Sequence, residues 1–311
     1  MKRTFRIIGV VIGLLLAVGL TGAGIVYARS NARLATTYEV PTMAGIELPT
    51  DAESLTEGER LYVTRGCVEC HTQDASGQVF IDDPAVGRVI ASNLTRGEGG
   101  LDSDYDSSDW LRALRHGIDS DGTGYYVMPA HHFNHYSDAD MGRIIAYVES
   151  LEPVDNVLPD HRPGPLARVF LTTPTTEGFL PAVLVDHENI DVWNDVEATV
   201  SEEYGHYLVR GGCLGCHTEN LSGGGIPGEA IPASNITFHE EGLTGWTLEE
   251  FATAMRNGMR PDGSVIDPTM PWYLYSRMTD EEIEAMYVYL QSVEPLAYGT
   301  ELTEENSVLN R

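Results

Sequence analysis

All four cysteines of the chain lie in two short segments that have the same form. The sequence C-x-x-C-H occurs at residues 67–71 and again at residues 213–217. Two thiols three positions apart can each form a thioether with one vinyl group of the same haem, and the histidine that follows can bind the iron. The pattern predicts two covalently bound haem c groups, attached through Cys67, Cys70, Cys213 and Cys216, with His71 and His217 as axial ligands.

Two other uses of paired cysteines compete with haem attachment. A redox dithiol would require a βαβ context, which this sequence does not show. The four cysteines together could form a tetrahedral zinc site if the two halves of the chain met. Neither alternative explains why a histidine follows both pairs. Haem attachment is therefore the favoured interpretation, and it leaves no cysteine for a structural disulfide.

A methionine followed by a proline lies downstream of each motif and can supply the sixth ligand of the iron. Met128 follows His71 by 57 residues, and Met270 follows His217 by 53. A thioether ligand raises the reduction potential compared with bis-histidine ligation, and the adjacent proline stiffens the loop that presents it. We expect Met128 and Met270 to be axial ligands.

The first half of the chain contains a competing set of ligands. His131, His132 and His135 follow Met128 closely, so one of them could replace the methionine. A displaceable ligand at one haem would suit a dihaem enzyme, such as a peroxidase or a sulfur-compound oxidase. The simpler interpretation places the three histidines in a solvated loop.

The two haem motifs belong to a sequence repeat, which indicates two copies of one domain. Four segments recur in the same order, 141 to 146 residues apart: 66–72 with 212–218, 92–95 with 234–237, 114–117 with 255–258, and 147–153 with 289–295. We place the first domain at residues 54–154 and the second at residues 201–298. Residues 155–200 between them are rich in proline, and we interpret them as an inter-domain segment that lies over the first domain.

Short helices must position the ligands, and the predicted fold class is all-α. We expect a first helix at 54–64 and 202–210, a middle helix at 108–116 and 247–257, and a last helix at 138–151 and 280–293. Capping boxes are expected at Ser54 with Glu57 or Thr56 with Glu59, at Thr247 with Glu250, and at Thr279 with Glu282. Gly117 and Gly258 lie where a helix C-terminal glycine belongs. No segment of either unit shows clear strand alternation.

The N-terminal segment, residues 1–33, can cross a membrane. No residue from Ile7 to Ala28 is charged, and these 22 residues would span about 33 Å as a helix. Three basic residues precede the span, which places the N-terminus in the cytoplasm. A cleaved signal peptide is the alternative. Both interpretations export the haem domains, and we predict a single-pass protein of the cell membrane with these domains on the periplasmic side. Residues 34–53 would form a spacer and 299–311 a polar tail.

The charge of the chain restricts its partners. Asp and Glu total 47 against 19 Lys plus Arg, which gives a formal net charge of −28. Such a surface repels phosphates, so we expect no nucleic acid partner. It favours redox partner proteins with a basic docking face, because complementary charge speeds association. General solvation, as in adaptation to high salt, explains the acidity equally well.

Taken together, these residues resemble class I c-type cytochromes, and among them the membrane-anchored cytochrome c subunits of periplasmic dehydrogenases. In that family an Asn-x-Thr segment, an Arg-x-Gly segment and a Met-Pro pair follow the haem motif, as they do twice here. The resemblance covers about residues 54–154 and 201–296 and implies two tandem class I cytochrome c domains. The chain has two such units, whereas the cytochrome subunits of alcohol dehydrogenases carry three haems. This difference leaves open whether its partner is an alcohol dehydrogenase.

The resemblance also implies roles for two further pairs of residues. Asn93 and Asn235 would lie near the haems, and Arg115 and Arg256 would pair with the propionates. Capping and surface pairing are the simpler roles for these side chains.

The ligands decide between function classes. With His and Met on both irons, no position is open to substrate, so we expect an electron-transfer protein without catalytic residues rather than an enzyme. It would carry single electrons from a dehydrogenase or a quinol-oxidising complex to a downstream cytochrome or oxidase. The dihaem enzyme is the alternative. A redox sensor is a third reading, but the six residues before the apolar span are too few for an output domain.

Overall fold

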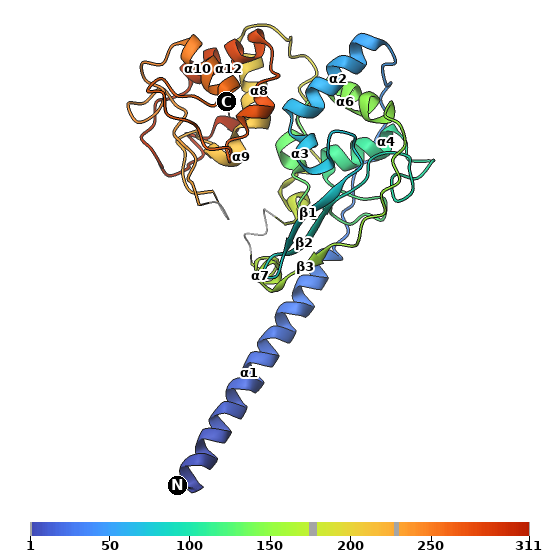
Figure 1. Cartoon of the computed structure of the whole chain (residues 1–311), viewed down its shortest axis with the longest axis vertical. Coiled ribbons are helices and arrows are strands. Elements are labelled where there is room, and N and C mark those ends of the chain that lie inside the picture. Colours follow the sequence, from blue (N-terminus) through green and yellow to red (C-terminus); the bar gives the residue numbers. More distant parts are fainter. Residues whose placement is uncertain (1, 174–178, 227–229, 311) are drawn as a thin grey trace.

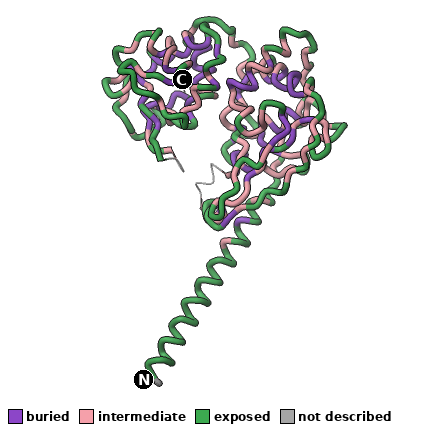
Figure 2. Tube along the Cα trace, viewed as in Figure 1, coloured by how far each residue is buried: buried purple, intermediate pink, exposed green. Residues whose placement is uncertain are grey.

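The chain forms two helical lobes at the end of one long helix (Figure 1). The computed structural model describes residues 2–173, 179–226 and 230–310. Helix α1 (Lys2–Leu34) projects from the first lobe and is exposed along most of its length (Figure 2). It is longer than the uncharged span because it continues through six more residues, to the point where the chain turns into the spacer. Of the described residues, only this helix is long and apolar enough to cross a membrane.

Each lobe contains the three predicted helices and two short ones. The first lobe has α2 (Ala52–Thr64), α3 (Cys67–His71), α4 (Ser107–Leu111) continued by the π-helix η1 (Arg112–His116), α5 (Ala130–Phe133) and α6 (Asp138–Glu149). The second has α8 (Glu202–Gly212), α9 (Leu214–His217), α10 (Leu248–Asn257), α11 (Trp272–Tyr275), α12 (Asp280–Ser292) and the terminal 3-10 turn η3 (Val308–Asn310). The fold is mostly helical, as predicted.

The first and last helices of each lobe cross at a glycine. A Cβ on Gly58 would lie 2.1 Å from the carbonyl oxygen of Arg143, and one on Gly205 would lie 2.0 Å from that of Ala285. Backbone therefore packs on backbone where α2 crosses α6 and where α8 crosses α12. The close approach buries the apolar faces of α6 and α12 that the sequence pattern predicted.

Four of the predicted helix ends are confirmed, and one is wrong. Thr247 with Glu250 and Thr279 with Glu282 form capping boxes. Gly117 and Gly258 end their helices in the left-handed region, with φ of 66° and 63°. Helix α2 instead begins two residues before the predicted start, because Asp51 accepts a hydrogen bond from the amide of Ser54 at 2.9 Å. No capping box at Ser54 or Thr56 forms.

The first lobe also holds a small sheet that the sequence analysis missed. Strand β1 (Gln78–Asp83) pairs antiparallel with β2 (Gly87–Ala91), which pairs with β3 (Arg162–Pro163). An irregularity between Val79 and Ile81 breaks the period of two, and it leaves both Val79 and Phe80 exposed. Simple alternation of apolar residues is therefore absent from β1, which is why no strand was expected.

The segment between the domains packs on the first lobe. It contributes β3, helix α7 (Pro165–Phe170) and the 3-10 turn η2 (Pro181–Leu184). Leu171 and Leu180 are buried against Val89 and Tyr126 of the first domain. The amide of Val127 donates a hydrogen bond to the carbonyl of Phe179 at 3.1 Å. The segment therefore lies over the first domain, beside the predicted ligand Met128.

The two lobes share a core and a buried charge cluster. Leu111, Tyr136 and Met141 of the first lobe belong to the same apolar cluster as the inner faces of α8 and α12. Arg65, which follows α2, lies beside Glu282 of α12, and both side chains are almost fully buried. The lobes therefore form a single packed unit.

Candidate haem sites

A cavity lies beside each C-x-x-C-H motif, and the residues predicted as iron ligands line it. The first cavity has a volume of about 330 Å³, and its lining includes Cys70, His71 and Met128. The second, of about 320 Å³, is lined by Cys213, Cys216, His217 and Met270, among others. Each domain thus brings one histidine and one methionine to one mostly apolar cavity, although more than 50 residues separate the two side chains in the sequence.

The two histidines are oriented by the same hydrogen bond. Nδ1 of His71 lies 2.9 Å from the carbonyl oxygen of Ser92, and Nδ1 of His217 lies 2.7 Å from that of Ser234. A carbonyl only accepts, so Nδ1 carries the proton and Nε2 keeps its lone pair for a metal. Burial lowers the pKa of both histidines, which favours this neutral form.

Strained backbone holds each histidine in place. The residues after the motifs, Thr72 and Thr218, both have φ of 68°, and Ala75 and Leu221 also lie in the left-handed region. Such conformations are costly for residues other than glycine and persist only where surrounding contacts impose them. In both domains the histidine carbonyl accepts a hydrogen bond of 3.1 Å from the glycine six residues later. The repeat therefore conserves a tight loop under the histidine as well as the motif.

The methionine loops are also built alike. The amide of Ala130 donates to the carbonyl of Met128 at 2.9 Å, and that of Trp272 donates to the carbonyl of Met270 at 2.7 Å. In each case the proline after the methionine precedes a helix of one turn, α5 or α11. Proline at this point fixes φ and starts the turn, so the methionine backbone is held at the cavity wall.

Asn93 and Asn235 line the cavities, as the resemblance implied. Both side chains are buried and make the same bonds. Asn93 accepts from the amide of Thr95 at 2.9 Å and donates to the carbonyl of Val154 at 2.8 Å. Asn235 accepts from Thr237 at 2.9 Å and donates to Leu296 at 2.7 Å. They join the loop under the histidine to the chain after the last helix.

Arg115 and Arg256, which the resemblance implied as propionate partners, each pair with an aspartate of their own domain. Arg115 bonds Asp138 at 2.6 Å, and Arg256 bonds Asp280 at 2.7 Å. Both aspartates are the first residue of the last helix, where a negative charge is favoured. Neither arginine lines a haem cavity that the described residues form. Their geometry fits the simpler role, joining the middle helix to the last one.

Two cavity residues were missed by the sequence analysis. Arg260 lines the second cavity, and its guanidinium donates to the carbonyl of Val265 at 3.0 Å. The first domain has Asp119 at the equivalent repeat position. His161, from the inter-domain segment, lines the first cavity, where its Nδ1 accepts from the amide of Ile90 at 3.2 Å. Both residues thus lie outside the repeated motifs.

Burial disfavours the thiolate form of three of the four cysteines. It raises the pKa of Cys67 to about 12, that of Cys70 to about 11 and that of Cys213 to about 12. A reactive redox dithiol needs a lowered pKa, so these thiols do not fit that role. Among the residues that the structure describes, no cluster of three or more His, Cys, Asp or Glu could hold a metal ion.

The three histidines after Met128 lie between the lobes, not in a solvated loop as expected. His135 is fully buried, and its Nε2 lies 3.1 Å from the carbonyl of Tyr207. Rings of His131 and His132 are 3.9 Å apart, and Nε2 of His132 lies 2.9 Å from where a Cβ on Gly215 would be. As far as residues 2–173, 179–226 and 230–310 define it, the first cavity includes none of the three. They are therefore poor candidates for an iron ligand.

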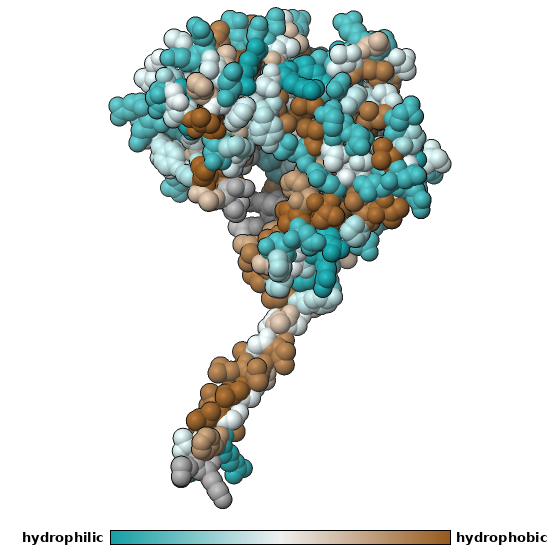
Figure 3. Space-filling view, in the orientation of Figure 1, coloured by the Kyte–Doolittle hydropathy of each residue, from teal (hydrophilic) through white to brown (hydrophobic). Residues whose placement is uncertain are grey.

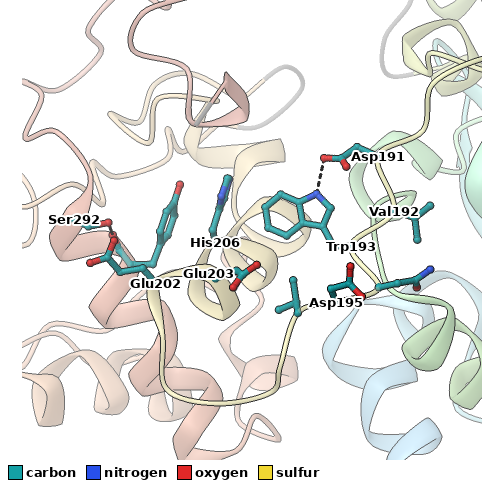
Figure 4. Close-up of a pocket in the computed structure, with 11 residues that line it drawn as sticks. Asp191, Val192, Trp193, Asp195, Glu202, Glu203, His206 and Ser292 are labelled. Atoms are coloured by element: carbon teal, nitrogen blue, oxygen red, sulfur yellow. Dashed lines mark hydrogen bonds between the residues drawn. The ribbon is translucent and has the colours of Figure 1, made fainter.

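A further hollow, of about 610 Å³, lies where the inter-domain segment meets the second lobe (Figure 4). Trp193 packs edge-on against His206 at 4.8 Å between centroids and donates to Asp191 at 2.6 Å. Arg210 covers the other side of the indole at 5.3 Å. No residue of either haem motif lines this hollow in the part of the chain that is described. We therefore assign it to packing of the segment on α8.

The family described as Cytochrome c matches this chain twice, at residues 55–152 and 203–294. These matches contain both motifs, both methionines and, apart from His161, the residues that line both cavities. The chain belongs to the cytochrome c family. Cytochrome c domains imply covalently bound haem c, and each matched region contains one C-x-x-C-H motif beside its cavity.

Cytochrome subunits of dehydrogenases are similar to this chain. The fructose dehydrogenase cytochrome subunit of Gluconobacter japonicus is 38% identical over 98 residues, 28% of this chain and 20% of that one. The cytochrome c subunit of the alcohol dehydrogenase (quinone) of Gluconobacter oxydans is 38% identical over 104 residues, 30% and 22% of the two chains. The gluconate 2-dehydrogenase cytochrome c subunit of Pantoea cypripedii is 26% identical over 272 residues, 76% and 58%. The chain thus spans less than two thirds of these relatives.

Proposed function

We propose that this protein is a membrane-tethered dihaem cytochrome that takes single electrons from a dehydrogenase and passes them to a downstream cytochrome or oxidase. The observation that carries the proposal is the matched pair of cavities, each lined by a haem motif and a methionine. Its relatives named as dehydrogenase cytochrome subunits support the donor class. Which substrate that dehydrogenase oxidises does not follow from the resemblance.

Each site holds its cofactor with residues of its own domain. Haem c, when bound, supplies a one-electron iron couple whose potential depends on the axial ligands and on burial. Cys67 and Cys70 would attach it in the first domain, and Cys213 and Cys216 in the second. His71 with Met128, and His217 with Met270, would close both axial positions. Closed axial positions favour electron transfer over catalysis.

Contacts of each haem motif with the other domain support electron exchange inside one molecule. Glu69, within the first motif, accepts a hydrogen bond of 2.7 Å from the hydroxyl of Tyr273, three residues after Met270. Gly215, within the second motif, lies against His132, four residues after Met128. The methionine loop of each domain thus touches the C-x-x-C-H motif of the other. We propose that the two domains act as a relay.

Anchoring and partner surface complete the proposal. Helix α1 would cross the membrane once, leaving both lobes on the periplasmic side, because three basic residues precede its apolar span. Beyond residue 38 the chain has 14 arginines and 47 acidic residues, a formal charge of −33. A partner with a basic docking face would associate faster with such a surface.

Carbon monoxide separates the electron carrier from the enzyme alternative, because it binds ferrous haem only where an axial position is open or labile. We expect no change in the optical spectrum when the fully reduced protein is exposed to carbon monoxide. Stoichiometric binding at one haem would overturn the carrier proposal and favour a dihaem enzyme. The Met128→Ala variant is the positive control, since it should bind one equivalent.

A further inference from the structure

Helix α7 is amphipathic, and its apolar face is exposed. Leu166, Val169 and Phe170 are 44%, 46% and 41% exposed, whereas Ala167 and Leu171 on the other face are fully buried. An isolated surface leucine or valine is ordinary, but three on one face of a short helix form a patch. The patch therefore requires an explanation in terms of what it contacts.

Contacts with α1 fix where α7 lies along the length of that helix. The guanidinium of Arg168 donates to Ser30 Oγ and Asn31 Oδ1, both at 2.8 Å. It also covers the ring of Tyr27 at 4.3 Å from the centroid. Because the uncharged span of α1 ends at Ala28, α7 lies at the level where that helix would leave a bilayer.

The sheet extends the same apolar surface. Val79 of β1 is 41% exposed, and β3 of this sheet leads directly into α7. Figure 3 shows hydrophobic surface from the end of α1 over α7 and toward the sheet. These four side chains, Leu166, Val169, Phe170 and Val79, are called the collar below.

Charge at the junction of α1 with α7 differs from the rest of the molecule. Arg29, Arg33 and Arg168 lie at the junction of α1 with α7, and the chain contains no acidic residue before Glu39. Arginines beside apolar side chains are typical of segments that lie in the membrane interface, where the guanidinium reaches the phosphates. A basic partner protein that binds the strongly acidic remainder of the chain would gain nothing from this local positive charge.

We propose that the collar lies in the headgroup region of the bilayer, so that the first cytochrome domain rests on the membrane surface instead of hanging from a free tether. This inference rests on the proposed anchoring by α1. It has a consequence for the first haem site. Val89 and Tyr126 line the first cavity and also pack on Leu171, the buried side of α7. One layer of side chains then separates that cavity from the membrane surface.

Spin labelling of the full chain tests the proposal. In the holoprotein all four cysteines would be in thioethers, so Phe170→Cys introduces one reactive thiol for a nitroxide. Two matched variants are Leu15→Cys, in the middle of the apolar span, and Val265→Cys, 69% exposed in the second lobe. Each is reconstituted in vesicles of phosphatidylethanolamine and phosphatidylglycerol. Power saturation with oxygen and with a water-soluble nickel chelate then reports the depth of each nitroxide in the bilayer. The same measurement under nitrogen is subtracted, because it contains the relaxation caused by haem iron.

The three labels distinguish failure of the collar from failure of the anchor. We expect the ratio of oxygen to nickel relaxation to be highest at 15, intermediate at 170 and lowest at 265. A label at 170 that behaves like the one at 265, or that neither reagent reaches, would overturn the collar while leaving the anchor intact. A water-exposed label at 15 would overturn the anchor and the collar together. The haem absorption spectrum checks that each variant is folded.

Discussion

Glu282 of α12 lies 2.5 Å from Arg60 of α2, and this ion pair joins the two cytochrome domains across more than 200 residues. Arg65 approaches the same carboxylate at 3.3 Å, and the side chains of Arg65 and Glu282 are 4% and 2% exposed. The carboxylate also closes the capping box of its own helix with Thr279. One buried residue thus couples the start of α12 to the helix that precedes the first haem motif.

Replacing Glu282 with Gln should destabilise the protein strongly. Arg65 would then keep only Asp140, at 4.0 Å, and Arg60 only Glu57, at 2.6 Å, and breaking a buried pair costs about 3–5 kcal/mol. The free energy of unfolding of the holoprotein, measured by urea denaturation, checks this value. Arg277→Gln is the matched control, because its pair with Glu59 is exposed and should contribute less than about 1 kcal/mol. Equal losses in both variants would contradict the assignment.

Stability should fall as the pH is lowered. Burial lowers the pKa of His135 to about 3, and the charge of Arg210 adds to the effect, whereas an unfolded histidine titrates near about 6.5. The unfolded chain therefore binds more protons between these values, and the stabilising contribution of neutral His135 is lost progressively below about pH 6.5. Urea midpoints measured from about pH 7 to pH 4 should decrease, and His135→Asn should show a smaller decrease. An identical pH profile in the variant would exclude His135.

Glu282 should add a second, more acidic loss. Burial alone would raise its pKa, but attraction by Arg65 and Arg60 holds the pKa below the ordinary value. A depressed carboxylate pKa gives stability that is present above the unfolded value of about 4.3 and is lost as the pH falls through the folded one. The slope of stability against pH below about 4.3 should therefore be shallower in Glu282→Gln. A slope as steep as that of the wild type would argue against the ion pair.

The helix crossings should not tolerate even one added methyl group. In Gly58→Ala and Gly205→Ala the new Cβ would meet a carbonyl oxygen near 2 Å, so the helices must separate. Overpacking of this kind costs about 1–3 kcal/mol. Gly225→Ala serves as control, because no atom lies within 4 Å of its added Cβ. Thermal unfolding should show that Gly58→Ala and Gly205→Ala are less stable than Gly225→Ala. A control variant as unstable as Gly58→Ala would refute the close packing of the helices.

Each methionine should control one haem. In Met128→Ala and Met270→Ala a single axial position opens, so each reduced variant should bind one equivalent of carbon monoxide. Loss of the thioether should also lower the potential of that haem alone, because this ligand raises it. Potentiometric titration with optical detection checks both domains in one experiment. If neither substitution changes the spectrum, the methionines are core residues and not ligands.

Electron exchange between the haems should be intramolecular. After photochemical reduction of one haem, re-equilibration should follow a first-order rate that does not depend on protein concentration. The reason is the reciprocal contact of Tyr273 with Glu69 and of His132 with Gly215. A rate proportional to protein concentration would mean that electrons pass between molecules, and the relay proposal would then fail.

Local signals in the sequence were sufficient for much of this protein. The C-x-x-C-H motif and the capping boxes at Thr247 and Thr279 depend on residues only a few positions apart, so their chemistry can be read without a fold. The repeat then located both methionines, because two copies of one domain must place equivalent residues alike. The uncharged run to Ala28 indicated a membrane helix from its length alone.

Tertiary contacts decided the rest. In the sequence, Arg115 and Arg256 lie between the haem motif and the methionine of their domains. In the structure, each arginine pairs with an aspartate at the start of the last helix. Strand β1 lacks alternation because an irregularity between Val79 and Ile81 breaks the period of two, and pairing with β2 holds it in the sheet. The role of His135 depends on Tyr207, 72 residues away in the other domain. Burial and ion pairing depend on which distant surfaces meet, and no local pattern encodes that.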